Sequence, residues 1–253
     1  MAGAQGFSIN VKSDIDAFIR RIDDVQRNQV PFVTAYALTK TAQDIKDAEI
    51  QAMAQVFDRP TRFTLNALYV KPATKTSLTA YVNFKEGFGS IPAWKYLGPE
   101  VEGGARSSKS HELRLRRAGI LKDGEFVVPG IRAPLDAYGN IPGSAIERIL
   151  SQLGAAGGTG YLANQTARSK RRNKTSHKYF VMRGVLGVKD GIYQQGTGHT
   201  ILPVMIFVRQ PHYGKRLDFY GIATRVFQQN FARRFREGWA RYVTKTAITA
   251  KAA

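Results

Sequence analysis

The stretch that constrains the fold most is alanine-rich and runs from Pro31 to about Phe57. Proline is well tolerated in the first turn of a helix, where an N–H would have no partner, so Pro31 predicts a helix start. The sequence "DRP" at residues 58–60 predicts the end. Small side chains suit close packing against neighbours, and they recur at Ala35, Ala37, Ala42, Ala48, Ala52 and Ala54. The sequence therefore predicts one long, closely packed helix here.

Two more helices are predicted from apolar periodicity. Between Ser13 and Asn28 apolar residues recur at helical spacing, and Ser13 with Asp16 resembles an N-terminal cap. A long final helix is predicted from about Phe219 into the 240s. Apolar side chains step by four along it, at Phe227, Phe231, Phe235, Trp239 and Val243. We interpret this stripe as the core-facing side of an amphipathic helix, with base stacking as the alternative.

Strand patterns occupy other parts of the chain. Apolar and polar residues alternate in "SLTAYVNF" (77–84), the period of a half-buried strand, and the preceding "ALYVKPATKT" resembles its hairpin partner. The segments "KYFVMRGVLG", "GIYQQ" and "TILPVMIFV" predict three strands of one sheet. Between these two regions lie two short helix patterns, "KSHELRLRRAGIL" and "GSAIERILSQLG".

Together these elements predict an α+β fold. N-terminal helices and a long C-terminal helix would pack on a mainly antiparallel sheet. We expect a single domain whose core comprises about 8–86 and 179–249, with an extended, loop-rich insertion at about 87–178. The flexible break "LGAAGGTG" (153–160) lies inside this insertion.

The net charge of the chain indicates which kind of partner it can bind. The chain has 38 Lys+Arg against 19 Asp+Glu, a net charge of +19. The excess begins after residue 60, because residues 1–60 carry seven basic and eight acidic side chains and residues 61–253 carry 31 and 11. Such a balance favours polyanions, either nucleic acids or acidic protein faces, since bound phosphates release counterions. It does not indicate base-specific reading.

Several kinds of chemistry lack support in the sequence. There is no cysteine, which excludes disulfides, thiolate catalysis and cysteine-type zinc sites. The four histidines are widely spaced, and no nucleophile or phosphate-loop motif is present. The acid pairs Asp23–Asp24 and Glu100/Glu102 could hold a nuclease metal, but we expect the first on a solvated helix face and the second in a loop. We therefore predict no enzyme, no metal and no cofactor. No apolar run approaches the ~20 residues that a membrane span needs, so no membrane partner is expected.

A basic arm is the candidate polyanion contact. It follows the glycine-rich break and holds six cations: Arg168, Lys170, Arg171, Arg172, Lys174 and Lys178. It is a solvated loop or a contact for DNA phosphates or an acidic subunit. A third reading, a nuclear-localisation signal, needs a eukaryotic setting for which nothing else in the sequence argues. No recognised nucleic-acid module surrounds it, so sequence-specific readout is not expected. Arg233, Arg234 and Arg236 of the final helix form a second candidate set.

Several segments together resemble a known class. The segment "QVPFVTAYALTKTAQDIKDAEIQAMAQVFDRPTRFTLNALYVKPAT" is similar to the opening of tailed-phage neck and tail-completion proteins. The later "GIYQQGTGHTILPVMIFVRQPHYGKRLDF", followed by a long amphipathic helix, also resembles that class, and the prophage minor tail protein Z family is the nearest in pattern. The resemblance covers about three-fifths of the chain through loose motifs, and none of them is a catalytic signature.

The resemblance implies a non-enzymatic virion protein at the head–tail junction, made in the cytoplasm of a bacterial host. It would form a homo-oligomeric ring, join the portal or connector to tail proteins, and help to retain packaged DNA. Large interfaces, and not pockets, would carry such a role. The alternative is a soluble nucleic-acid-binding protein without sequence preference. A metal-dependent nuclease is a third hypothesis.

Overall fold

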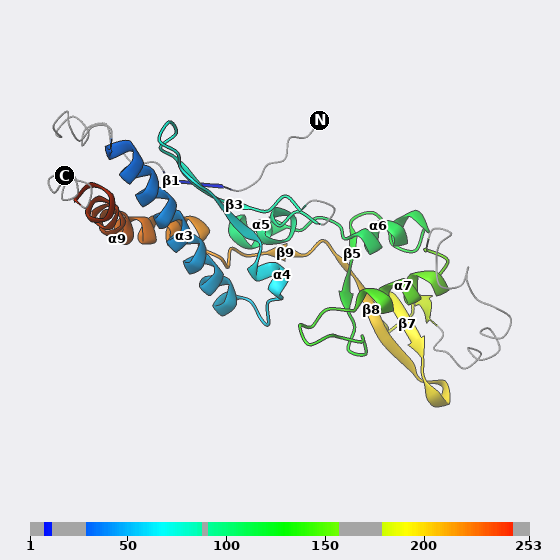
Figure 1. The fold of residues 1–253 in the computed structure, drawn as a ribbon. Coiled ribbons are helices and arrows are strands. Elements are labelled where there is room, and N and C mark those ends of the chain that lie inside the picture. The colour runs from blue at the N-terminus through cyan, green and yellow to red at the C-terminus, as the bar shows by residue number, and fades with distance from the viewer. Residues whose placement is uncertain (1–7, 12–28, 88–90, 157–178, 245–253) are drawn as a thin grey trace, which may run out of the picture. The chain divides into compact units, whose positions relative to one another are not determined.

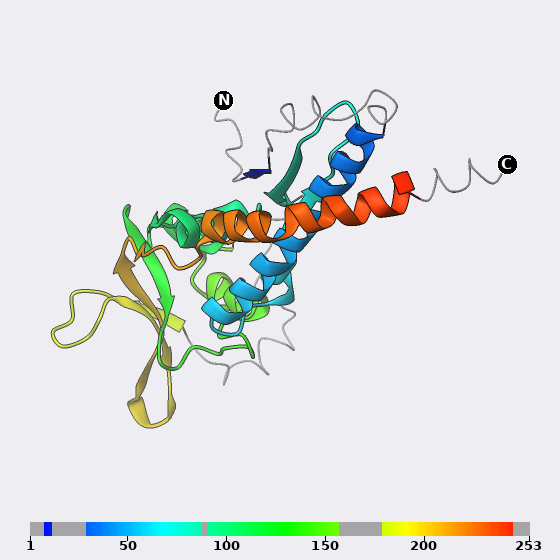
Figure 2. The ribbon, with the colours of Figure 1, turned by 90° about the vertical axis from the view of Figure 1, so that its left-hand side faces the viewer.

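The computed structural model describes residues 8–11, 29–87, 91–156 and 179–244, and Figures 1 and 2 show its ribbon from two directions. The chain forms two compact units: unit 1 comprises residues 1–103 and 214–253, and unit 2 comprises residues 104–213. Helices occur with antiparallel sheets, which confirms the predicted α+β class. The helix predicted over 13–28 lies outside the described residues.

Unit 1 packs two long helices against a three-stranded antiparallel sheet of order β1-β3-β2. Its described elements are β1 (Ser8–Val11), α3 (Val30–Val56), α4 (Arg62–Leu65), β2 (Leu68–Lys71), β3 (Ala80–Phe84), α5 (Trp94–Glu102), α9 (Phe219–Trp239) and a π-helical turn, η3 (Ala240–Thr244). In the central strand, Val82 pairs with Ile9 on one side and with Val70 on the other. The predicted β2–β3 hairpin is therefore confirmed.

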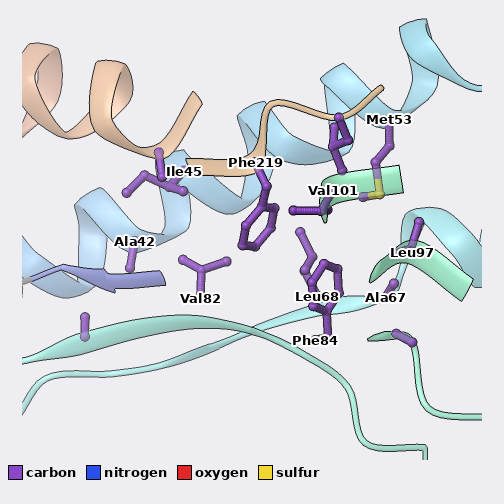
Figure 3. Close-up of a cluster of buried hydrophobic side chains, with 14 of the residues drawn as sticks. Ala42, Ile45, Met53, Ala67, Leu68, Val82, Phe84, Leu97, Val101 and Phe219 are labelled. Atoms are coloured by element: carbon purple, nitrogen blue, oxygen red, sulfur yellow. The ribbon is translucent and has the colours of Figure 1, made fainter. Parts of the chain in front are cut away.

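The long alanine-rich helix is confirmed as α3, with Pro31 in its first turn. Its buried side and the inward residues of β3 enclose the core of unit 1, which Figure 3 shows. Phe219, at the start of α9, stacks on Phe84 of β3 with ring centroids 5.0 Å apart. Ala80, Val82 and Phe84 are buried while Tyr81 and Asn83 between them are only half-buried, as the alternation predicts.

The aromatic stripe of α9 faces the core only in part. Phe227 and Phe231 stack on each other at the margin of the core and are half-buried. The fully buried positions of α9 are instead Phe219, Ala223 and Gly238. At Gly238 the helix comes so close to α3 that an added Cβ would lie 2.8 Å from the ring of Tyr36. Gly238, which is not part of the aromatic stripe, is thus one point at which α9 comes close to α3, the helix it crosses in Figure 2.

Unit 2 is built on a four-stranded antiparallel sheet of order β5-β8-β7-β6. Its described elements are β4 (Gly104–Ala105), α6 (Ser110–Arg117), β5 (Glu125–Pro129), α7 (Gly143–Gln152), β6 (Tyr179–Met182), β7 (Gly191–Gln195), a 3-10 turn η2 (Thr197–His199), β8 (Ile201–Arg209) and β9 (His212–Tyr213). The three strands predicted after residue 178 are confirmed as β6, β7 and β8, and both short helix patterns are confirmed as α6 and α7. Strands β4 and β9 pair as a separate two-stranded ribbon.

The division into units differs from the predicted one. We expected residues 179–213 to belong to the same core as the N-terminal helices, with 87–178 as an insertion. Instead β5, from within that insertion, pairs with β8 along Glu125–Pro129. Leu115 of α6 and Ile149 of α7 share a buried cluster with Ile192, Val204 and Met205 of the sheet. The described part of the expected insertion therefore supplies six of the ten buried residues of a second hydrophobic core.

Candidate polyanion and subunit interfaces

The structure describes only the second set of predicted contact residues. Arg168, Lys170, Arg171, Arg172, Lys174 and Lys178 all lie outside the described residues. Arg233, Arg234 and Arg236 lie on α9. Arg236 is exposed, and Arg233 is 55 % exposed although its Nη2 lies 3.6 Å from the Asp44 carboxylate. These two remain accessible to a partner.

Arg234 instead ties α9 to α3. Its Nε and Nη2 donate to the two carboxylate oxygens of Asp44 at 2.9 and 2.6 Å, and Nη1 donates to Glu237 at 2.9 Å. Hydrogen bonds to Asp44 and Glu237 raise the pKa of this guanidinium above its ordinary value. Arg234 thus has a structural role in unit 1 that its position in a basic helix does not reveal.

We expect Arg234→Ala to lower the free energy of unfolding by about 1–3 kcal/mol, because it leaves a carboxylate of low exposure without its bidentate partner. Arg236→Ala removes the same charge from an exposed position and should change stability by less than about 0.5 kcal/mol. Denaturant unfolding of both variants measures the difference. Equal losses in the two variants would contradict the structural role of Arg234.

In unit 2 each acidic residue has a polar partner within the same unit. The chain has six acids between residues 104 and 213. Five form ion pairs with arginines of the same unit, and Asp136 accepts hydrogen bonds from the backbone N–H groups of Tyr138 and Asn140 in a turn. The paired acids are Glu112, Asp123, Glu125, Glu147 and Asp190.

Glu112 is the most deeply placed of these acids, with a side chain that is 0 % exposed. Its oxygens accept from Arg106 at 2.6 and 2.8 Å and from the backbone N–H groups of Lys109 and Val127, each at 2.7 Å. Burial alone would raise the pKa of Glu112, but these hydrogen bonds outweigh it and lower the pKa. One carboxylate thus connects three segments: the start of α6, the residues around Arg106, and β5.

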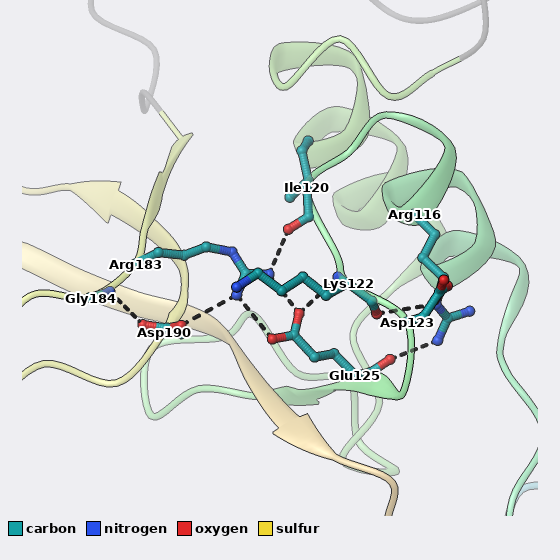
Figure 4. A network of polar contacts seen from close by, with 8 residues as sticks. All are labelled: Arg116, Ile120, Lys122, Asp123, Glu125, Arg183, Gly184 and Asp190. Carbon is teal, nitrogen blue, oxygen red and sulfur yellow. Dashed lines mark hydrogen bonds and ion pairs between the residues drawn. The ribbon is translucent and has the colours of Figure 1, made fainter.

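Arg183, which directly follows β6, is hydrogen-bonded to several segments of unit 2, as Figure 4 shows. It donates to Glu125 at 2.6 and 3.0 Å, to the carbonyl of Ile120 at 2.7 Å and to Asp190 at 3.3 Å. The hydrogen bond from Arg183 lowers the pKa of Glu125. Asp190 also accepts from the Gly184 N–H at 2.8 Å, which fixes the turn between β6 and β7.

Among the described residues of unit 2, the exposed charged side chains that form no ion pair are mostly cations, since Asp136 is the one acid that forms none. Among the described residues of this unit, seven cations are exposed and form no ion pair: Lys109, Arg117, Lys122, Arg132, Arg148, Lys189 and Arg209. Large apolar side chains are exposed as well, above all Leu186 at 100 % and Ile131 at 88 %. The described surface of unit 2 therefore combines cations with exposed apolar side chains.

Unit 1 holds a buried acid that the sequence analysis did not single out. Glu49 of α3 is 0 % exposed, and neither carboxylate oxygen has a hydrogen-bond partner among the described residues. Burial, reinforced by the charge of Asp218 and opposed by Arg225, raises the pKa of Glu49 to about 8. This raised pKa favours the protonated form of Glu49 at neutral pH. Its spacing of four from Ile45 and Met53, both buried, is the signal that could have placed it on the core side.

The other candidate residues give no catalytic constellation in the described part of the chain. No group of three or more His, Asp or Glu side chains that could hold a metal occurs among the residues that the structure describes. Glu100 and Glu102, expected in a loop, lie in α5, where they approach Arg216 at 3.7 Å and Lys215 at 3.9 Å. Burial is the main cause that lowers the pKa of His111 to about 4. None of the described helices has the length and apolar character of a membrane span.

Comparisons of the chain with protein-family models, with curated proteins and with solved structures find no match.

Proposed function

We propose that this chain is a structural protein of a tailed-phage head–tail junction, present as a homo-oligomeric ring in the virion. In this role it joins the portal or connector to tail proteins, catalyses no reaction, and contacts packaged DNA through phosphates without reading bases. The sequence resemblance described above supports this assignment. The physical argument comes from the surface of unit 2.

The observation that carries the proposal is the exposure of large apolar side chains on ordered turns. Leu186 is 100 % exposed, in a turn that Arg183 and Asp190 hold in place. Ile131 is 88 % exposed, beside backbone hydrogen bonds that join Gly130 and Arg132 to β8. Burying one such side chain is worth about 1.5–3 kcal/mol. Positioned apolar tips of this kind favour burial against neighbouring subunits.

The double variant Leu186→Ser with Ile131→Ser should weaken self-association by about 100- to 10,000-fold, because the burial of two apolar side chains is lost. Sedimentation velocity across a range of protein concentrations measures the effect. Leu113→Ser is the matched control, because Leu113 is 44 % exposed on α6 and is not at a turn tip. If the control and the double variant weaken self-association equally, Leu186 and Ile131 do not form the interface.

A soluble, non-sequence-specific nucleic-acid-binding protein is the second candidate. The seven exposed, unpaired cations in the described part of unit 2 favour it. Such a protein would stay a monomer or dimer and shift duplex DNA in a gel, with affinity falling steeply as salt rises. A junction protein would instead co-purify with portal or tail proteins.

A further inference from the structure

Both α6 and α7 carry exposed cations. Arg117 at the end of α6 and Arg148 on α7 are exposed. Lys109 at the start of α6 is exposed as a residue, although partial burial lowers the pKa of its ammonium group. The two helices pack on each other, and Arg114 of α6 spans them by donating to Glu147 of α7 at 2.9 Å. We call the surface formed by Lys109, Arg114, Arg117 and Arg148 the α6–α7 face.

Negative charge on this face is small. The only acids in the two helices are Glu112, which is buried under Arg106, and Glu147, which is 55 % exposed and engages Arg114. The surface thus carries four cations against one exposed carboxylate, which Arg114 already engages. The field of such a face attracts polyanions over several ångströms in ordinary salt.

The face is fixed before any partner arrives. Leu115 of α6 and Ile149 and Leu150 of α7 are buried in the core of unit 2. The start of α6 is held through the hydrogen bond from the Lys109 N–H to Glu112. Cations mounted on helices held in this way lose less conformational freedom on binding than cations on a free loop.

The described residues on either side of the basic arm are attached to this same face. Ala156, which precedes it, accepts a hydrogen bond from Arg114 at 3.3 Å. Tyr179, which follows it, donates its backbone N–H to Gln152 of α7 at 3.1 Å. The last described residue before the arm and the first described residue after it are thus hydrogen-bonded to α6 and α7.

We propose that the α6–α7 face is a contact surface for the phosphate backbone of duplex DNA, with Lys109, Arg117 and Arg148 as its phosphate ligands. It neutralises phosphates and reads no bases, because it presents cations without a recognition helix or an aromatic stacking platform. This inference deepens the DNA contact of the proposed function and assigns it to residues of unit 2 outside the arm.

The test compares two triple variants of the full chain for binding to a random-sequence duplex of about 30 base pairs. Lys109→Gln/Arg117→Gln/Arg148→Gln should weaken binding at least about tenfold and reduce the slope of log K against log salt by about 2–3, since each phosphate contact contributes about 0.9. Lys71→Gln/Lys75→Gln/Lys95→Gln removes the same charge from exposed positions of unit 1 and should leave the slope unchanged.

A variant that removes a negative charge should have the opposite effect on DNA binding. Glu147→Gln removes the one partly exposed acid and frees Arg114, so it should tighten DNA binding by about 3- to 10-fold. The NMR signals of His111, whose neighbours include Lys109 and Arg114, should shift on adding the duplex. If both triple variants lose the same DNA affinity, the effect comes from net charge alone and the assignment is overturned. The assignment is also overturned if the wild-type chain does not bind the duplex.

Sedimentation of the same variants separates this inference from the proposed function. If DNA affinity falls while self-association is unchanged, the α6–α7 face binds DNA and assembly uses other surfaces. If all variants assemble but none binds DNA less tightly than wild type, the proposed function survives and this inference fails.

Discussion

Glu112→Ala is expected to cost about 3–5 kcal/mol of stability, the range for removing one partner of a buried ion pair. The variant leaves Arg106, only 11 % exposed, without its carboxylate, and it removes the acceptor of two backbone N–H groups. Three parts of unit 2 lose their common anchor at once. Thermal unfolding should therefore show a large fall in Tm, and hydrogen exchange should show the loss of protection concentrated in residues 104–156.

Glu147→Ala is the matched control for this prediction. Glu147 also pairs with an arginine of α6, but it is 55 % exposed and should contribute no more than about 1 kcal/mol. The lowered pKa of Glu112 adds a pH signature. The stabilisation from the Glu112 carboxylate is complete above the unfolded pKa of about 4.5 and is lost as pH falls through the lower folded pKa. The wild-type protein and Glu112→Ala should therefore become more similar in stability at acidic pH. A Glu112→Ala variant as stable as Glu147→Ala at pH 7 would contradict the account.

Glu49→Gln should stabilise the protein, by about 3 kcal/mol at pH 7. The folded pKa of Glu49, about 8, lies above the ordinary value of 4.5, so folding retains a proton that the unfolded chain releases. Stability from this group is therefore greatest below pH 4.5 and declines as pH rises to about 8. Glutamine resembles the protonated carboxyl and is insensitive to pH. The advantage of the variant should thus be small at pH 4 and reach about 3–5 kcal/mol at pH 9.

Denaturant unfolding at pH 4, 7 and 9 measures this difference. Asp47→Asn, at an exposed position of the same helix, tests whether the loss of any negative charge from α3 has the same effect, and it should change stability by less than about 0.5 kcal/mol. A Glu49→Gln variant whose stability runs parallel to wild type from pH 4 to pH 9 would show that Glu49 does not remain protonated in the fold.

Local patterns predicted the elements better than they predicted the assembly of those elements. The start at Pro31, the alternation at 77–84 and the four-residue steps after Phe219 each reflect short-range geometry, and each identified an element that the structure contains. Strand β5 was not predicted. Its five residues lie in a region rich in glycine and proline, and only the pairing with β8, some 80 residues later, makes them a strand.

The same limit explains the unit boundaries and the roles of single charges. Whether residues 179–213 join one core or another depends on long-range contacts with Leu115 and Ile149, which no local period encodes. Arg234 looks like its neighbours Arg233 and Arg236 in sequence. It is distinguished only by Asp44, 190 positions earlier in the chain, which accepts its hydrogen bonds. The ion pairs of the acidic residues of unit 2 likewise depend on the fold and could not be predicted from the sequence.

The central claim is that the chain acts as an assembled ring, and the mass of the purified protein in solution tests it most directly. Native mass spectrometry with sedimentation velocity should give one closed oligomer at micromolar concentrations, dissociated by the Leu186→Ser/Ile131→Ser double variant. A wild-type chain that remains a monomer over the whole accessible concentration range while shifting duplex DNA would contradict the ring and favour the free nucleic-acid-binding protein.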